Sequence, residues 1–268
     1  MFTAKEILQQ MQDMNAPTGG LVVMHTSMRA VGPVEGGVEQ FLKIMVDYFT
    51  QDGGLFCVPA HTGHNIGKEI TVDMINGDTH LGAFSTVALQ HPDGVRSENP
   101  ILSMVVFGDP NRVREFVKDE PFIRTATAPE GCYGKLFSYG GSVLLVGVAH
   151  NRNTYLHAVG EILQLPNRMA DTPIATTVRR ASGEIVHRDI GLYHVDFTDD
   201  ISSRFLKYET AFRYHRCITD GFIGNAPAQL CDARKMKETV ELIFRNNAGK
   251  DPLANEYQIP QRLYCTRR

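Results

Sequence analysis

Two short apolar runs joined by one amphipathic segment constrain the fold of this chain more than any other feature. The runs LVVMHTS at 21–27 and LFCVPA at 55–60 have the length and composition of buried strands. Between them, the segment 36–54 places apolar residues at helical spacing and ends in Gly53 and Gly54, a typical helix stop. A strand–helix–strand unit almost always forms a parallel pair with a right-handed crossover. The sequence therefore predicts an α/β protein.

The remaining periodic segments extend this core in both directions. Apolar runs at 101–108 and 142–149 predict two further strands, and residues 173–195 alternate about a Ser-Gly-Glu turn, which predicts an antiparallel hairpin. Helical patterns occur at 4–14, 81–91, 111–120, 154–165, 199–213 and 227–246. Together they predict one domain over residues 1–268, with a central mixed, largely parallel sheet flanked by helices and an antiparallel hairpin addition.

Composition narrows the class of protein. The net charge of −3 does not indicate nucleic-acid binding, and the apolar runs are too short to span a membrane. Five cysteines occur without a C-x-x-C pair, which is typical of reduced thiols, and Cys57 is expected in the core. The N-terminal stretch lacks the apolar centre of a signal peptide. We therefore expect a cytoplasmic protein that binds neither nucleic acid nor membrane.

A burst of polar residues, HNRNTYLHAVGE at 150–161, follows the apolar run at 142–149. On a helix, His157 and Glu161 lie one turn apart on the same face. A carboxylate near an imidazole can orient the ring and raise its basicity, which suits a general base. Such a base would lie beyond the carboxyl end of a strand, where open α/β sheets bind ligands. A surface His–Glu pair without function would show the same spacing, so that alternative stays open.

The polar stretch at 61–80 predicts a long loop. Its histidines, His61 and His64, have a spacing compatible with a metal site, and Asp73 and Asp78 follow in the same loop. Two loop histidines are more typical of a solvated polar segment, and we expect no metal centre. The sequence contains no G-x-S-x-G, no G-x-x-x-x-G-K-[ST] and no H-E-x-x-H motif.

Four separated segments resemble motifs of the aminoglycoside N3-acetyltransferases. HTSMRAVGPVEGG at 25–37 is similar to the family's His-Ser-Ser-Leu-Ser-x-x-Gly segment, and LFCVPAHT at 55–62 to its strand ending in Pro-x-x-Thr. RSENPILSMVVFG at 96–108 resembles Arg-Ser-x-His-Pro-x-x-Ser, and the end of 135–161 resembles Asn-Thr-Ser-Leu-His-Leu-Ala-Glu. The segment 221–238 is similar to the family's Gly-x-Val-Gly-x-Ala region. Order and spacing agree from residue 25 to residue 238.

This resemblance implies acetyl-CoA as co-substrate and direct transfer of its acetyl group to the 3-amino group of an aminoglycoside, a reaction of antibiotic resistance. It assigns the general base to His157. The family's carboxylate lies three residues after this histidine, where the chain has Gly160, and Glu161 comes one residue later. On a helix that shift turns the side chain by about 100°. Either Glu161 or Asp196, which lies in a family-like VDF segment, is expected to orient the ring.

The resemblance also implies binding residues. Thr26 and Ser27 would offer a hydroxyl and backbone N–H groups to the tetrahedral oxyanion, and backbone N–H groups at Gly36 and Gly37 would approach the CoA diphosphate. His25 is expected to be a core or supporting residue. The expected cofactor-binding residues are Thr26, Ser27, Met28, Arg29, Gly36, Gly37, Leu102, Ser103 and Met104. The expected anionic partners of the polycationic substrate, besides the catalytic acids, are Asp73, Asp78 and Glu209.

Three alternatives remain open at this point. The chain could acetylate another small amine, because the family's tryptophan is missing and the carboxylate is displaced. It could bind CoA without catalysis, through an acceptor site that has decayed at Gly160. It could be a metal-dependent hydrolase that uses His61 and His64. The expected partners are a small-molecule aminoglycoside and coenzyme A, and the prediction leaves room for a homodimer.

Overall fold

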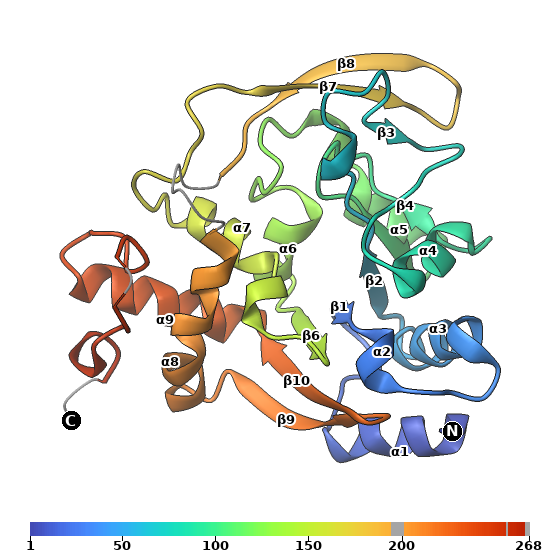
Figure 1. Ribbon diagram of the computed structural model, residues 1–268, viewed down its shortest axis with the longest axis horizontal. Helices are drawn as coiled ribbons and strands as arrows, with labels where there is room; N and C mark the ends of the chain where they lie inside the picture. The colour runs from blue at the N-terminus through green and yellow to red at the C-terminus, as the bar shows by residue number, and fades with distance from the viewer. Residues whose placement is uncertain (194–200, 256, 266–268) are drawn as a thin grey trace.

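The computed structural model describes residues 1–193, 201–255 and 257–265. Within these ranges the central feature is a seven-stranded sheet of order β4-β5-β2-β1-β6-β10-β9 (Figure 1). At its centre, β1 (Leu21–Thr26) runs parallel to both β2 (Leu55–Pro59) and β6 (Ser142–Val146). The strand–helix–strand unit predicted from the sequence therefore forms the middle of the sheet, with α3 (Gly37–Phe49) as its crossover helix.

The outer strands pair in the antiparallel sense. On one side, β5 (Met104–Phe107) joins β2 and β4 (Val95–Arg96) joins β5. On the other side, β10 (Ala226–Asp232) joins β6 and β9 (Ile218–Ile223) joins β10. The predicted mixed sheet flanked by helices is confirmed, although its parallel part is confined to β2, β1 and β6.

A small second sheet contains the predicted hairpin. Strands β7 (Ile174–Arg179) and β8 (Ile185–Ile190) pair in the antiparallel sense, and β3 (Val72–Asp73) adds to β7 in parallel. Figure 1 shows this sheet at the top of the view. Because β3 belongs to the long polar loop after β2, this sheet joins that loop to the hairpin.

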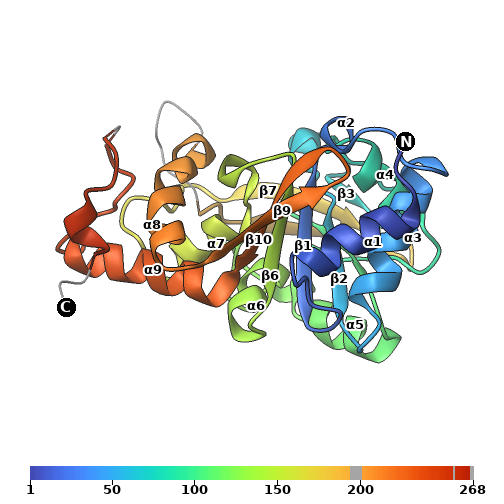
Figure 2. The ribbon, with the colours of Figure 1, turned by 90° about the horizontal axis from the view of Figure 1, so that it is seen from below.

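Helices cover both faces of the large sheet, which explains why its central strands are apolar throughout. In β1, Leu21 and Val23 belong to one hydrophobic cluster, whereas Val22 and Met24 belong to the other. The first cluster includes α5 (Pro110–Val117), α6 (Cys132–Ser138), α7 (Tyr155–Ile162), α8 (Glu209–Tyr214) and α9 (Ala233–Asn246). The second includes α1 (Ala4–Asp13), α2 (Met28–Val31), α3 and α4 (Ala83–Gln90). Figure 2 shows α1 and α3 at one end of the molecule and α8 and α9 at the other.

Two sequence predictions in the C-terminal third were wrong. The helix predicted at 227–246 begins only at Ala233, because the residues before it form β10, and β9 was missed. Pairing with the buried strand β6 overrides the weak local preference of this segment. The helix predicted at 199–213 is, from residue 201, a 3₁₀ segment, η4 (Ile201–Tyr208), followed by the short helix α8.

The cysteines and the helices agree with two simpler expectations. All five cysteines are free, and Cys57 is fully buried in the core, as predicted. In the part of the chain that the structure describes, every helix is too short or too polar to cross a membrane.

Candidate active site

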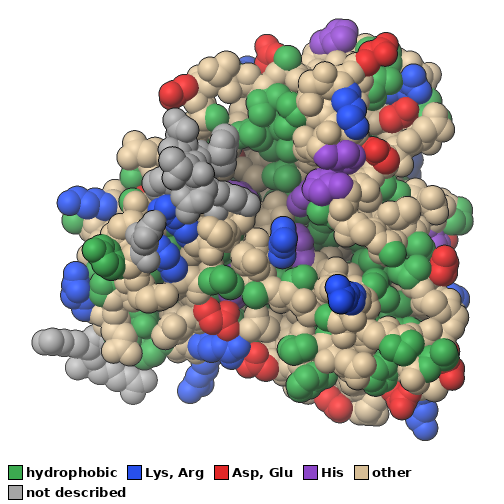
Figure 3. Space-filling model, in the orientation of Figure 1, with side chains coloured by type: hydrophobic (Ala, Val, Ile, Leu, Met, Phe, Trp, Pro, Cys, Tyr) green, Lys and Arg blue, Asp and Glu red, His purple; other side chains and the backbone are tan. Residues whose placement is uncertain are grey.

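A cleft lies at the carboxyl ends of the parallel strands. One cavity of about 310 Å³ lies between the loop after β2 and the start of α7, and a second of about 390 Å³ lies beside it. Both cavities are lined by His25, His80, Leu81 and Arg152, so they lie next to each other. Figure 3 shows a hollow near the centre of this face, with histidine side chains gathered along one side. The first cavity is lined by His25, His61, His80, Leu81, Ile101, Leu102, Ala126, Thr127, Asn151, Arg152, Asn153, Thr154, His157, Leu192, Tyr193 and Ser202.

The proposed base, His157, projects from the first part of α7 into the first cavity. Its Nε2 lies 3.0 Å from the hydroxyl oxygen of Ser202 in η4. Its ring packs edge-on against Phe205 at a centroid distance of 4.9 Å. Two contacts from one 3₁₀ segment therefore hold the orientation of the ring while it faces the cavity.

The carboxylate predicted to support His157 lies one turn further along α7. Glu161 accepts hydrogen bonds from the hydroxyl groups of Thr125 and Thr127, the second at 2.7 Å. Burial raises the pKa of the Glu161 carboxyl, and these hydrogen bonds oppose that rise. Because Thr127 lines the cavity, Glu161 supports the cavity wall from behind. The other predicted acid, Asp196, lies outside the described residues.

The histidines His25 and His61 both line the first cavity, and His25 also lines the second. His61 Nε2 lies 2.8 Å from the hydroxyl of Tyr133, and burial, followed by the neighbouring His25, His80 and His157, lowers its pKa well below the ordinary value. His25 is only 8% exposed, and burial lowers its pKa to about 4. These rings are therefore neutral near pH 7, and they offer hydrogen bonds rather than charge.

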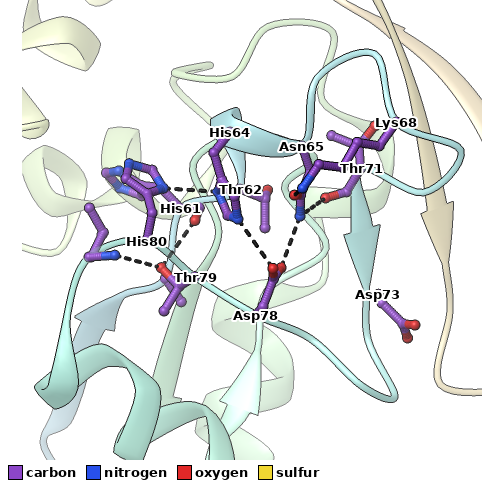
Figure 4. A network of polar contacts seen from close by, with 12 residues as sticks. His61, Thr62, His64, Asn65, Lys68, Thr71, Asp73, Asp78, Thr79 and His80 are labelled. Carbon is purple, nitrogen blue, oxygen red and sulfur yellow. Dashed lines mark hydrogen bonds and ion pairs between the residues drawn. The ribbon is translucent and has the colours of Figure 1, made fainter.

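His64 and His80 belong to a polar network in the loop after β2 (Figure 4). Their Nδ1 atoms lie 3.0 Å apart, and His64 Nε2 lies 3.2 Å from Asp78 Oδ2. Asn65 donates to the other carboxylate oxygen of Asp78 at 2.9 Å. Among the described residues, no group of three or more His, Cys, Asp or Glu side chains could hold a metal ion.

The three acids predicted to bind substrate are engaged elsewhere in the described structure. Asp73 forms an ion pair with Arg179 at 3.0 Å, and Figure 4 shows it apart from the Asp78 network. Glu209 lies 3.2 Å from His150 Nε2, and this contact, opposed by burial, lowers its pKa to about 2. Within the described lining of either cavity, neither these two acids nor Asp78 appears.

The residues predicted to bind the cofactor divide into two groups. Thr26 lines the second cavity and Leu102 lines the first. Ser103 is fully buried and donates to the Ala60 carbonyl at 2.6 Å, and Met104 lies in the core, so both fit a buried strand.

The other members of this set follow β1 along the chain. The Ser27 amide donates to the Val146 carbonyl at 2.9 Å, and its hydroxyl caps α2, which contains Met28 and Arg29. Ser27 therefore caps α2, and its backbone N–H is already hydrogen-bonded within the sheet. Gly36 and Gly37 precede and begin α3 with φ of 75° and 74°, values that favour glycine.

Sequence reasoning missed several residues of the cleft. His25 stands next to Thr26 in the quoted motif and was assigned to a supporting role, and Arg152 stands inside the polar burst before α7. Both residues lie in segments that attracted attention, but a residue with a role in the cleft could not be told from an ordinary strand or turn residue. For Ser202 and Tyr193 the sequence carries no local signal, because only the folded chain brings them to α7.

Comparisons with known proteins agree with this architecture. The family model described as aminoglycoside 3-N-acetyltransferase matches residues 23–245. Aminoglycoside N(3)-acetyltransferase III of Serratia marcescens is 25% identical, over 87% of this chain and 94% of its own length. The structure of AAC-IIIb with CoASH has a TM-score of 0.78 at 19% identity, covering 93% of this chain and 98% of that one. A mutant of AAC(3)-IVa in complex with a gentamicin has a TM-score of 0.78 at 22% identity, covering 92% of this chain and 90% of that one.

These matches settle the class of protein. The solved structures confirm the fold, and the family match confirms the predicted acetyltransferase class. The CoA in the AAC-IIIb structure agrees with acetyl-CoA as the predicted co-substrate. From its fold, its motifs and the extent of the match, the chain belongs to the aminoglycoside 3-N-acetyltransferase family.

Proposed function

We propose that this protein transfers the acetyl group of acetyl-CoA to the 3-amino group of an aminoglycoside, with His157 as general base and without a covalent acyl-enzyme. The observation that carries this proposal is the position of His157 in a cavity that lies next to a second cavity, which Thr26 lines. A base at that place can meet both a donor in the second cavity and an acceptor in the first. The CoA and gentamicin complexes of the neighbours support this choice of ligands.

The residues present fit a thioester donor. Two buried polar atoms at the end of β1, Nε2 of His25 and Oγ1 of Thr26, have no hydrogen-bond partner in the described structure. Both residues line the second cavity. A buried polar atom without a partner costs free energy, which a bound carbonyl group would recover. The Thr26 hydroxyl is thus suited to the donor's carbonyl oxygen, whereas the Ser27 amide is already used.

The chemistry requires an unprotonated amine at the acetyl carbon. The acceptor nitrogen attacks, its proton passes to the imidazole of His157, and the thiol leaves with a proton. Ser202 and Phe205 hold the ring in place for this transfer. Glu161, which is hydrogen-bonded to Thr125 and Thr127, fixes the cavity wall, and its negative charge lies near the acceptor cavity.

The decisive experiment is His157→Ala, with thiol release measured in the presence of acetyl-CoA and an aminoglycoside. We expect turnover to fall by at least about 10²-fold while acetyl-CoA binding, measured by calorimetry, is retained. The matched control is His187→Ala, because His187 is an exposed histidine on β8. Unchanged turnover in His157→Ala would refute the assignment of the base.

Acetylation of a different small amine is a second candidate, and one observation favours it. The acids predicted to hold a polycation are engaged outside the described cavity lining, which is rich in histidines and aliphatic side chains. A panel of aminoglycosides assayed beside simple amines separates the two functions by kcat/KM. Addition of EDTA is expected to leave turnover unchanged, whereas a metal-dependent hydrolase would lose its activity. A protein that only binds CoA would release no thiol with any amine.

A further inference from the structure

His25 has features that a supporting core residue does not need. It lies near the carboxyl end of β1, the central strand of the sheet, where it is in register with Leu145 of β6. Its side chain is 8% exposed, yet its Nε2 has no hydrogen-bond partner within the described structure. Buried imidazole nitrogens are normally paired, so an unpaired one on a residue that lines two cavities points to a ligand at this place.

We propose that His25 is a catalytic residue that donates a hydrogen bond from Nε2 to the carbonyl oxygen of the thioester, and so stabilises the oxyanion of acetyl transfer. This proposal rests on the proposed function. Its geometric basis is that His25 lines both cavities, whereas His157 lines only the first and Thr26 only the second. The ring therefore lies where the acyl end of a donor in the second cavity would meet an acceptor beside His157.

The electrostatic environment keeps His25 suited to this task. Burial lowers its pKa to about 4, so the ring is neutral at the pH at which an amine can be deprotonated by His157. The titratable or charged groups that line the same cavities are His61, His80, His157, Tyr193 and Arg152. None of them supplies negative charge to His25 near pH 7, since burial raises the pKa of Tyr193 to about 12. A neutral imidazole can polarise a carbonyl without competing for the proton of the acceptor.

The hydrogen bond from His25 would act while the acetyl group passes from sulfur to nitrogen. The nitrogen lone pair forms a bond to the acetyl carbon, and the carbonyl π electrons move to oxygen, where the hydrogen bond from His25 strengthens as charge develops. The proton of the nitrogen passes to His157. When the C=O bond reforms, the C–S bond breaks, and His157 returns the proton to the leaving sulfur. The products are the N-acetyl amine and the free thiol of CoA, and no oxidant or metal is needed.

The kinetic test compares His25→Leu with His25→Gln, because the glutamine amide can place an N–H near the position of Nε2. We expect His25→Leu to lower kcat by about 10²–10³-fold with little change in acetyl-CoA affinity. We expect His25→Gln to recover at least about tenfold of this loss. His187→Leu is the control, since His187 is exposed and lies on β8. A loss of less than about threefold in a folded His25→Leu would overturn the proposal.

A spectroscopic test needs no acceptor, because it observes the bound acetyl-CoA directly. Acetyl-CoA labelled at the carbonyl carbon is bound to the wild-type protein, and the infrared stretch of its carbonyl is recorded. We expect a shift to lower frequency than in water, retained in His25→Gln and lost in His25→Leu. A wild-type carbonyl without this shift would overturn the inference.

The two tests also separate this inference from the proposed function. A His25-dependent shift in a protein that acetylates no amine would support the oxyanion donor and refute the proposed activity. Acetylation that depends on His157 but not on His25 would support the proposed activity and refute His25 as the oxyanion donor.

Discussion

A Cβ atom at position 160 would lie 2.9 Å from Nη1 of Arg168, closer than side-chain atoms normally approach. Arg168 cannot easily move away, because Nε and Nη2 donate to the two carboxylate oxygens of Asp251 at 2.6 and 2.7 Å and the residue is 2% exposed. The ring of Tyr193 closes the same space at 3.3 Å. At position 160, where the family places its carboxylate, the side chains of Arg168 and Tyr193 therefore occupy the space beside the helix. The acidic residue of α7 is instead Glu161.

This contact predicts the effect of a single methyl group. Gly160→Ala is expected to lower the free energy of unfolding by roughly 1–2 kcal/mol, because overpacking against Arg168 and Tyr193 exceeds the gain in helix propensity. Gly63→Ala is the matched control, since its Cβ would meet only Ile101 at 3.8 Å. Urea unfolding of both variants measures the difference. Greater stability in Gly160→Ala would show that the Arg168 side chain moves aside at little cost in free energy.

The contact between His157 and Ser202 predicts a modest kinetic effect. Ser202→Ala removes the hydroxyl that lies 3.0 Å from His157 Nε2, but it leaves the packing of Phe205 on the ring. We expect kcat to fall roughly tenfold, the worth of one hydrogen bond, and the pH at half-maximal kcat to move. The control is Ser182→Ala in the exposed turn before β8. An unchanged pH profile would mean that the hydroxyl does not influence the base.

Glu161 is expected to behave as a wall residue rather than as the partner of the base. Glu161→Gln should change kcat by less than about fivefold, because the hydrogen bonds of its carboxylate come from Thr125 and Thr127. A loss as large as that of His157→Ala would contradict this placement.

The raised pKa of Glu161 adds a prediction about stability. Above the ordinary value of 4.5, the folded protein holds this proton more tightly than the unfolded chain does, so ionisation of the wild type opposes folding as pH rises. The stability of Glu161→Gln relative to wild type should therefore increase with pH above 4.5, which urea unfolding at several pH values measures.

The lowered pKa of His25 predicts that the folded protein loses stability as pH falls, the opposite direction to the effect of Glu161. Its folded pKa of about 4 lies below the ordinary 6.5, so between these values the unfolded chain binds more protons. Stability present above pH 6.5 is therefore lost as pH falls toward 4, by about 3 kcal/mol. His25→Leu lacks this contribution, so its stability should fall less between about pH 7 and about pH 5. An equal slope in wild type and variant would show that burial does not shift this histidine.

The sequence predicted the centre of the fold because the chemistry there is local. The two apolar runs and the helix between them fix β1, α3 and β2, since buried strands and an amphipathic helix have few other arrangements. The sequence prediction failed at 226–232, where APAQLCD has no clear period and forms a strand by pairing with β6 and β9. The order of the outer strands likewise depends on contacts between distant segments.

The candidate site shows the same division. His157 was predicted from helical spacing and a resemblance, and Thr26 from the resemblance and its place at a strand end. Both line the cleft, and their catalytic roles stay predictions. The acids were harder to place, because a carboxylate in a loop looks the same whether it meets a substrate or, like Asp73, an arginine on a neighbouring strand. His25 was set aside because an isolated histidine in an apolar strand carries no sign of the cavity beside it.

The pairing of β3 with β7 has a mechanical consequence. The loop that carries β3 also carries His61 and His80 on one wall of the cleft, and the chain beyond β8 carries Leu192 and Tyr193 on the other. The small sheet joins these two segments, so a shift of one would strain the β3–β7 pairing or displace the other. A ligand that displaced either segment on entering or leaving the first cavity would therefore load the hairpin as well.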